Sequence, residues 1–235
     1  MGISITDLMF PRKCPLCGET RLFGESGVCE KCEKSLPWIK APVCLKCGKT
    51  IDDPALECCV DCIKIPKSFE RCYAAFSYEG TIKESLYDFK YKNQREYAVF
   101  YCDSIVKKYG DELKKLHIDG VIPVPVHRHK KRVRGYNQAK LLAKELSAAI
   151  NAPLYADYLQ RYEDTEPQKE LDDRERMKNL KNAFKIAENV VKLDTVLLVD
   201  DIYTSGATME ACTSVLMSVG INKVFGVCAA IGRGY

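Results

Sequence analysis

The chain has 235 residues, enough for one α/β domain together with a small module. Apolar residues make up 46% of it, as in ordinary globular proteins, and no apolar run reaches the roughly 18–20 residues of a membrane span. The first residues also lack the features of a signal peptide, so we expect a cytoplasmic protein. The net charge of +4 is mild, but residues 127–144 hold seven Lys or Arg and no acidic residue, so any affinity for a polyanion is expected there.

Cysteines are concentrated near the start of the chain, where nine of the 13 lie between Cys14 and Cys62. Without an export signal, this clustering favours metal binding over disulfides. Eight of them form C-x-x-C pairs, in which two thiolates can bind one tetrahedral ion. The pairs are Cys14/Cys17, Cys29/Cys32, Cys44/Cys47 and Cys59/Cys62.

We predict that these pairs make two structural Zn²⁺ sites in a module of residues 1–66 that depends on metal to fold. Consecutive pairs give the simplest ligand sets. An interleaved pairing, an iron–sulfur cluster and a redox C-x-x-C pair remain open, and Cys58 is a spare thiol. Beyond folding, such a module could contact nucleic acid or protein.

Residues 67–235 have the pattern of an α/β domain, beginning with a strand over 71–78. A helix is expected from Thr81 onward, with Ile82, Leu86 and Phe89 on one face, and a second helix over 96–109. Lys90 and Lys92, near the junction, are expected in solvent, although Lys90 is also a candidate phosphate contact.

A basic run follows the next expected strand, residues 120–126, which its prolines should end near Pro125. Five Lys or Arg and two His fall within residues 127–134, before a helix that begins near Asn137. Charges on a solvated helix face would be spaced at helical intervals, so a contiguous run predicts a loop that binds a phosphate-rich ligand. His127 and His129 are expected to be neutral donors there, or less simply general acids.

The most informative stretch is VLLVDDIYTSGAT, residues 196–208. Val196–Val199 predict a buried parallel strand, the carboxylates of Asp200 and Asp201 follow, and a helix begins near Gly206. Backbone N–H groups at a helix start bind anions, while neighbouring carboxylates accept hydrogen bonds from hydroxyl groups. The segment therefore predicts a site for a ribose and its 5′-phosphate, at the same sheet edge as the basic run.

This stretch resembles the signature of type I phosphoribosyltransferases, which bind phosphoribosyl pyrophosphate (PRPP). The resemblance implies a parallel open sheet flanked by helices, Asp200 and Asp201 as catalytic groups, and Mg²⁺ bound with PRPP. The implied PRPP contacts are Asp200, Asp201, Tyr203, Thr204, Ser205, Gly206, Ala207, Thr208, Val126, His127, Arg128 and Lys131. The polar residues 161–178 resemble the hood loop that closes over PRPP, although they could form a surface loop and a helix instead.

A narrower resemblance covers nearly the whole chain. Residues PVPVHRHKKRVRGYNQAKLLAKELS, the later TEPQKELDDRERMKNLKNAF and the N-terminal CPLCG resemble the ComF family of competence-associated proteins. The family implies a double zinc ribbon fused to a phosphoribosyltransferase fold and a part in single-stranded DNA uptake during natural transformation, with DNA-uptake or recombination proteins as possible partners.

Two functions of different kinds follow. The first is a PRPP-binding protein that handles single-stranded DNA, and the alternative is an active phosphoribosyltransferase with an unidentified nucleobase or amine acceptor. Phosphates of PRPP and of DNA are alike to Lys and Arg, so the basic run fits both. The candidate nucleic-acid contacts are Arg128, Lys130, Lys131, Arg132, Arg134 and Tyr136.

Overall fold

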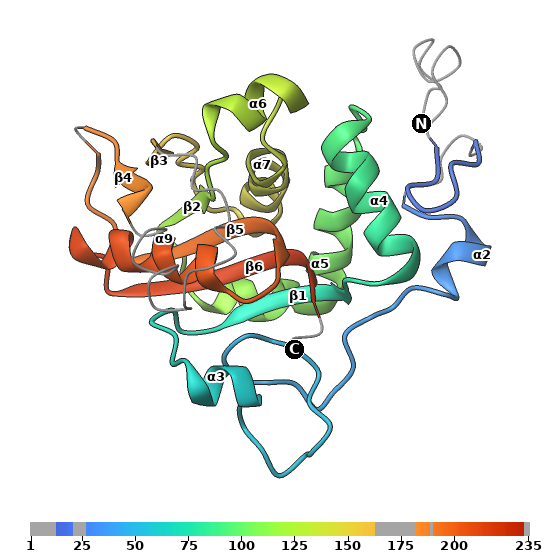
Figure 1. The fold of residues 1–235 in the computed structure, drawn as a ribbon, viewed down its shortest axis with the longest axis horizontal. Helices are drawn as coiled ribbons and strands as arrows, with labels where there is room; N and C mark the ends of the chain where they lie inside the picture. Colours follow the sequence, from blue (N-terminus) through green and yellow to red (C-terminus); the bar gives the residue numbers. More distant parts are fainter. Residues whose placement is uncertain (1–12, 21–26, 163–181, 189, 233–235) are drawn as a thin grey trace, which may run out of the picture.

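The computed structural model describes residues 13–20, 27–162, 182–188 and 190–232. Its centre is a four-stranded parallel sheet in the order β1-β6-β5-β2 (Figure 1). The strands are β1 (Cys72–Ser77), β2 (Gly120–Pro123), β5 (Thr195–Tyr203) and β6 (Lys223–Ile231). The central strands read as near-continuous apolar runs because helices and loops cover both faces of a parallel sheet.

Helices lie on both faces of the sheet (Figure 1). One face is covered by α4 (Gly80–Tyr91), α5 (Tyr97–Lys115) and α7 (Gln138–Ile150). The other is covered by α9 (Ala207–Ser218) and by the antiparallel hairpin of β3 (Leu159–Arg161) and β4 (Phe184–Ile186). The predicted fold class, a parallel sheet flanked by helices after a cysteine-rich module, is confirmed.

The expected helices form, with changed bounds. Ile82, Leu86 and Phe89 are buried on one face of α4, as the sequence pattern predicts. The second helix, α5, continues to Lys115, beyond the expected end at 109, because Leu113 still reaches the core. The predicted helix start near Asn137 is confirmed, since the Asn137 side chain caps α7 by accepting the backbone N–H of Ala139 at 3.0 Å.

The cysteine-rich module lies along the β1 edge of the sheet. It contains the short helices α2 (Glu30–Glu33), beside α4, and α3 (Val60–Lys64), below β1 (Figure 1). Between them, the chain runs antiparallel to β1: the N–H of Ile39 donates to the Ala75 carbonyl at 3.0 Å, and Trp38 stacks on Phe76 at 4.6 Å. The module therefore supplies an outer partner to an edge strand.

The two halves of the module belong to different cores. Cys14 and Cys32 pack in the core on the α4–α5–α7 face, while the four cysteines from Cys44 to Cys62 pack in the core on the α9 face. The module thus contacts both faces of the sheet.

Candidate functional site

The acidic doublet lies inside a strand, not beyond its end. β5 continues past Val199 through Asp200 and Asp201 to Tyr203, because its backbone keeps pairing with β6 as far as Ile231. Side chains of successive strand residues point to opposite faces of a sheet. The two carboxylates therefore have different neighbours.

Asp200 faces the start of α9. It lines a small pocket with residues of the 203–209 segment and with Cys228 of β6. Gly206 has φ +77°, a left-handed conformation, and the amides of the first helical turn point out of α9 beside it. The pocket has a volume of only about 20 Å³, so it suits one end of an anionic ligand and not a whole nucleotide.

The environment of Asp200 favours a neutral carboxyl group. Burial, followed by the charge of Asp201, raises its pKa to about 8. The backbone N–H of Asp201, which donates to Asp200 Oδ1 at 2.8 Å, and the Lys90 ammonium act in the opposite direction.

Asp201 forms an ion pair with Lys90 of α4 at 2.8 Å. The side chains of Lys90 and Asp201 are only 18% and 12% exposed, so the expectation that Lys90 is solvated is wrong. Burial opposes the charged ammonium, but the carboxylate of Asp201 outweighs it and raises the pKa of Lys90. The helical spacing that buries Phe89 also turns its neighbour Lys90 towards the sheet. The position of Lys90 in the helix therefore predicts its burial, although a lysine is normally expected in solvent.

The aromatic ring of Tyr203 is buried beneath the loop that follows it. It packs edge-on against Phe69 at 6.3 Å, and its hydroxyl lies directly under Gly206, where an added Cβ would clash. Glu210, in the first turn of α9, accepts both the N–H and the O–H of Ser68, at 2.7 and 2.6 Å. These contacts join the 203–210 segment to the chain that leaves the second half of the cysteine module.

The basic run forms a short helix, α6 (Arg128–Arg134), and not the expected loop. His127 caps it, accepting the backbone N–H of His129 at its Nδ1, and Gly135 ends it with φ +78°. No residue of this helix is buried. The charges are contiguous because every face of the helix meets solvent, so no apolar stripe interrupts them. Since β2 and β5 are parallel neighbours, α6 and the Asp200 pocket follow the same sheet edge.

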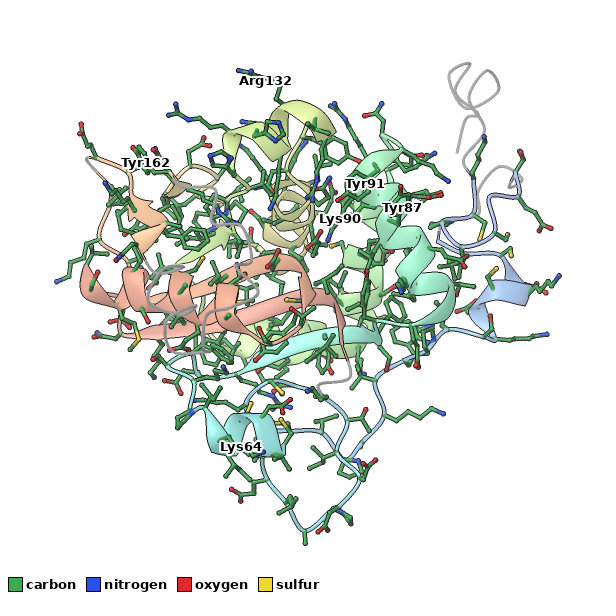
Figure 2. The ribbon with its side chains drawn as sticks, in the orientation of Figure 1. Lys64, Tyr87, Lys90, Tyr91, Arg132 and Tyr162 are labelled. Carbon is green, nitrogen blue, oxygen red and sulfur yellow. The ribbon has the colours of Figure 1, made fainter. Side chains whose placement is uncertain are left out.

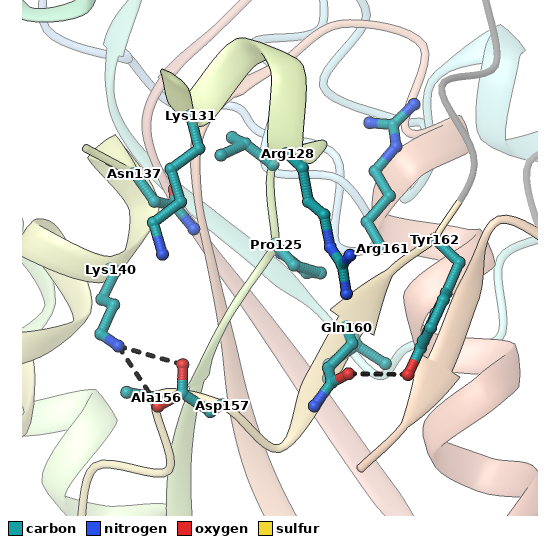
Figure 3. A pocket seen from close by; sticks show the side chains of 12 residues that line it. Pro125, Arg128, Lys131, Asn137, Lys140, Ala156, Asp157, Gln160, Arg161 and Tyr162 are labelled. Carbon is teal, nitrogen blue, oxygen red and sulfur yellow. Dashed lines mark hydrogen bonds and ion pairs between the residues drawn. The ribbon is translucent and has the colours of Figure 1, made fainter. Parts of the chain in front are cut away.

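A larger pocket of about 170 Å³ lies between α6, the start of α7 and β3 (Figure 3). Arg128 and Lys131 reach into it from α6, with Lys140 and Gln160 below them. Its lining contains one carboxylate, Asp157, which pairs with Lys140 at 3.1 Å. It also contains four cations, namely Arg128, Lys131, Lys140 and Arg161. The excess positive charge suits an anion. Of the residues predicted to bind PRPP, Val126, Arg128 and Lys131 line this pocket, whereas Asp200, Tyr203, Thr204 and Gly206–Thr208 line the smaller one.

Tyr136 does not offer the exposed ring that base stacking needs. It is 6% exposed, donates its hydroxyl to the Phe89 carbonyl, and is covered by the guanidinium of Arg95 at 4.8 Å. We therefore expect no base to stack on Tyr136, whose ring packs inside the protein.

Eight cysteines gather in two groups of four, and the sulfurs of each group lie within 4.8 Å of one another. The groups are Cys14, Cys17, Cys29 and Cys32, and Cys44, Cys47, Cys59 and Cys62. Consecutive pairs thus combine, which selects the simplest of the pairings that the sequence leaves open. Four thiolates at this separation fit a tetrahedral zinc ion with no open position, so these groups fit structural zinc-ribbon sites. Cys58 remains a partly exposed free thiol.

Residues 163–178 of the expected hood loop lie outside the described residues. Gln160 and Glu210 escaped sequence reasoning, because they have no motif and only the fold brings them near the pockets. Lys140 and Arg161 lie in stretches that the sequence singled out, but not as lining of this pocket. Among the described residues, no helix combines the length and the apolar character needed to cross a bilayer.

Fold and site together define an α/β protein with two anion-suited pockets at one sheet edge and two four-cysteine groups. Residues 5–63 match the double zinc ribbon domain family. Along 92% of its length the chain is 28% identical to Competence protein F of Haemophilus influenzae, covering 95% of that protein. It is 26% identical to the DNA utilization protein YhgH of Escherichia coli K12, with 92% of this chain and 96% of that protein aligned. Over most of its length the chain is thus similar to proteins named for competence and for DNA utilization.

Two further similarities are more distant. Competence protein ComFC of Bacillus subtilis is 25% identical over 63% of this chain and 58% of that protein. Among solved structures, an adenine phosphoribosyltransferase aligns at a TM-score of 0.38 and 13% identity, covering 63% of this chain and 75% of that one. A purine phosphoribosyltransferase from Pyrococcus horikoshii aligns at a TM-score of 0.34 and 17% identity. The alignment covers 59% of this chain and 73% of that one.

Proposed function

We propose that this protein binds PRPP with Mg²⁺ and handles single-stranded DNA during its uptake in natural transformation. The observation that carries the proposal is the common sheet edge of the Asp200 pocket and the exposed basic helix α6. The names of the competence and DNA-utilization relatives, aligned over almost the whole chain, support the DNA role.

In this proposal the pocket at the start of α9 receives the 5′-phosphate. Outward backbone N–H groups and the hydroxyls of Thr204 and Thr208, which line the pocket, provide donors there, with Ser205 beside them in the same loop. Asp200, once ionised, accepts ribose hydroxyls, and Asp201 keeps its charge through Lys90. Mg²⁺ prefers oxygen ligands, which PRPP and its water shell supply, and it would offset charge on the pyrophosphate.

Single-stranded DNA would meet α6, where Arg128, Lys131 and Arg132 project into solvent. Phosphate contacts of this kind release counterions, so the affinity should fall steeply with salt. Zinc in the two cysteine groups would act structurally, holding the module against both faces of the sheet.

One observation favours an enzyme as the second candidate. The larger pocket beside Arg128 and Lys131 has room for pyrophosphate or an acceptor that the small pocket lacks. In that reaction the acceptor's lone pair forms a bond to the anomeric carbon of PRPP, and the bond to pyrophosphate breaks with its electrons leaving on pyrophosphate. The cations would stabilise that departing charge.

Calorimetry with PRPP·Mg²⁺ and anisotropy with a labelled oligothymidylate test the proposal. Asp200→Ala with Asp201→Ala should abolish PRPP binding and leave DNA binding intact. Arg128→Ala, Lys131→Ala and Arg132→Ala together should weaken DNA binding and reduce the salt slope by about 0.7 for each phosphate that is no longer neutralised. The proposal fails if the wild-type chain binds neither ligand. Pyrophosphate release in the presence of an acceptor would favour the enzyme.

A further inference from the structure

An exposed tyrosine pair lies on α4. The side chains of Tyr87 and Tyr91 are 57% and 51% exposed, and their ring centroids are 4.9 Å apart. They are four residues apart, so they lie side by side on one face of the helix. Figure 2 shows them near Lys90, which points towards the sheet from the same helix.

This placement is unusual for the molecule. The third aromatic of the helix, Phe89, is fully buried, as are most of its large aromatic neighbours. The outer face of an amphipathic helix normally carries charged and polar residues. Packing within this chain therefore accounts for Phe89 but leaves most of each tyrosine ring in solvent.

Helix α6 supplies a cation to the pair. The guanidinium of Arg134 lies 5.0 Å from the centroid of the Tyr91 ring, and its Nη2 donates to the Tyr91 hydroxyl at 3.1 Å. This contact joins residues 43 positions apart in the sequence. Asp88, an acid on the same turn of α4, is paired with Lys92 at 2.9 Å, so its charge is offset. The exposed aromatic pair thus lies directly beside the basic helix.

We propose that Tyr87 and Tyr91 stack the bases of single-stranded DNA while the cations of α6 hold its phosphates. The inference rests on the proposed DNA function and names the surface that performs it. Exposed aromatic rings beside a row of cations suit single-stranded DNA, because each base can stack on a ring and each phosphate can bind a cation. Duplex DNA, whose bases are already stacked, should gain nothing from the tyrosines.

Anisotropy with a labelled oligothymidylate at fixed salt tests the role of the rings. We expect Tyr91→Ala to weaken binding by about 5- to 100-fold, with a further loss when Tyr87→Ala is added. Tyr91→Phe keeps the ring and should bind as the wild type does. Val219→Ala is the control, since this apolar side chain is 47% exposed but lies at the end of α9, away from α4 and α6.

An abasic strand of equal length separates stacking from charge. The wild type and the Tyr87→Ala/Tyr91→Ala variant should bind it equally and with the same salt slope, because only phosphates remain. The surface assignment is overturned if the variant binds oligothymidylate as tightly as the wild type, or if its affinity for the abasic strand falls equally. Should the wild type bind no single strand at all, the DNA function itself fails.

Discussion

At the scale of single residues, two adjacent aspartates have opposite electrostatic situations. Asp200 has a pKa raised to about 8 chiefly by burial, whereas Asp201 keeps a cation at 2.8 Å. Neighbouring carboxylates that differ in this way divide their tasks, because one retains a fixed charge while the other can exchange a proton with its ligand.

The raised pKa of Asp200 predicts a pH-dependent stability. In the unfolded chain the group titrates near its ordinary pKa of 3.8, so between about pH 4 and 8 the folded state holds a proton that the unfolded state has lost. This contribution is complete below pH 4 and is lost as the pH rises through 8. Asp200→Asn, neutral at every pH, should therefore exceed the wild type in free energy of unfolding by several kcal/mol at pH 8, and by much less at pH 5.

Urea denaturation at the two pH values measures the difference. Asp157→Asn is the control, because that carboxylate is 83% exposed and should show no such gain. An equal effect of Asp200→Asn at both pH values would contradict a half-buried Asp200 that is protonated in the folded state.

Lys90 provides a second residue-scale prediction. Lys90→Met leaves the Asp201 carboxylate buried without its cation, which should cost about 3 kcal/mol of stability. Adding Asp201→Asn removes the unpaired charge and should recover much of that stability. A double-mutant cycle by chemical denaturation measures the coupling, and strictly additive effects would show that the pair contributes nothing.

At the scale of elements, the second half of the cysteine module supports the loop before α9. Phe69 packs against Tyr203, Ser68 binds Glu210, and the N–H of Cys72 donates to the Lys46 carbonyl at 2.7 Å. Ser68 and Phe69 belong to the chain that leaves the second half, and Lys46 belongs to that half itself. The first half, which packs on the opposite face of the sheet, makes none of these contacts among the described residues. The two metal groups should therefore differ in their effect on ligand binding.

We expect Cys59→Ser with Cys62→Ser to weaken PRPP binding about tenfold, since the support beneath Gly206 loosens. Cys14→Ser with Cys17→Ser should leave the affinity unchanged, although each variant loses one of the two zinc ions. Elemental analysis verifies the metal content and calorimetry the affinity. Equal reductions of affinity in both variants would refute a selective link between this half of the module and the loop.

At the scale of the whole molecule, periodicity and motif spacing predicted the layered sheet, the helix starts and the sulfur groups. These features depend on residues near each other in sequence or on strong burial patterns, as for Phe89 and Asn137. The burial of Tyr136 and Lys90 was missed because tertiary neighbours decide it. The helix α6 was missed because a helix exposed on every face has no apolar stripe. No local sequence pattern predicts the contact of Arg134 with Tyr91, or that Gln160 and Lys140 line the same pocket.

The outer partner of β1 has a consequence for the cell. Residues 37–39 cover this edge strand and are joined to α5 by Lys108, whose ammonium donates to the Ile39 carbonyl at 2.5 Å. They lie between the two cysteine groups, so we expect their position to depend on metal sites folded at both ends. Under zinc starvation the strand would lose this cover, and a bare sheet edge recruits strands from other chains. We would then expect the zinc-free protein to aggregate through this exposed strand, and not merely to lose its activity.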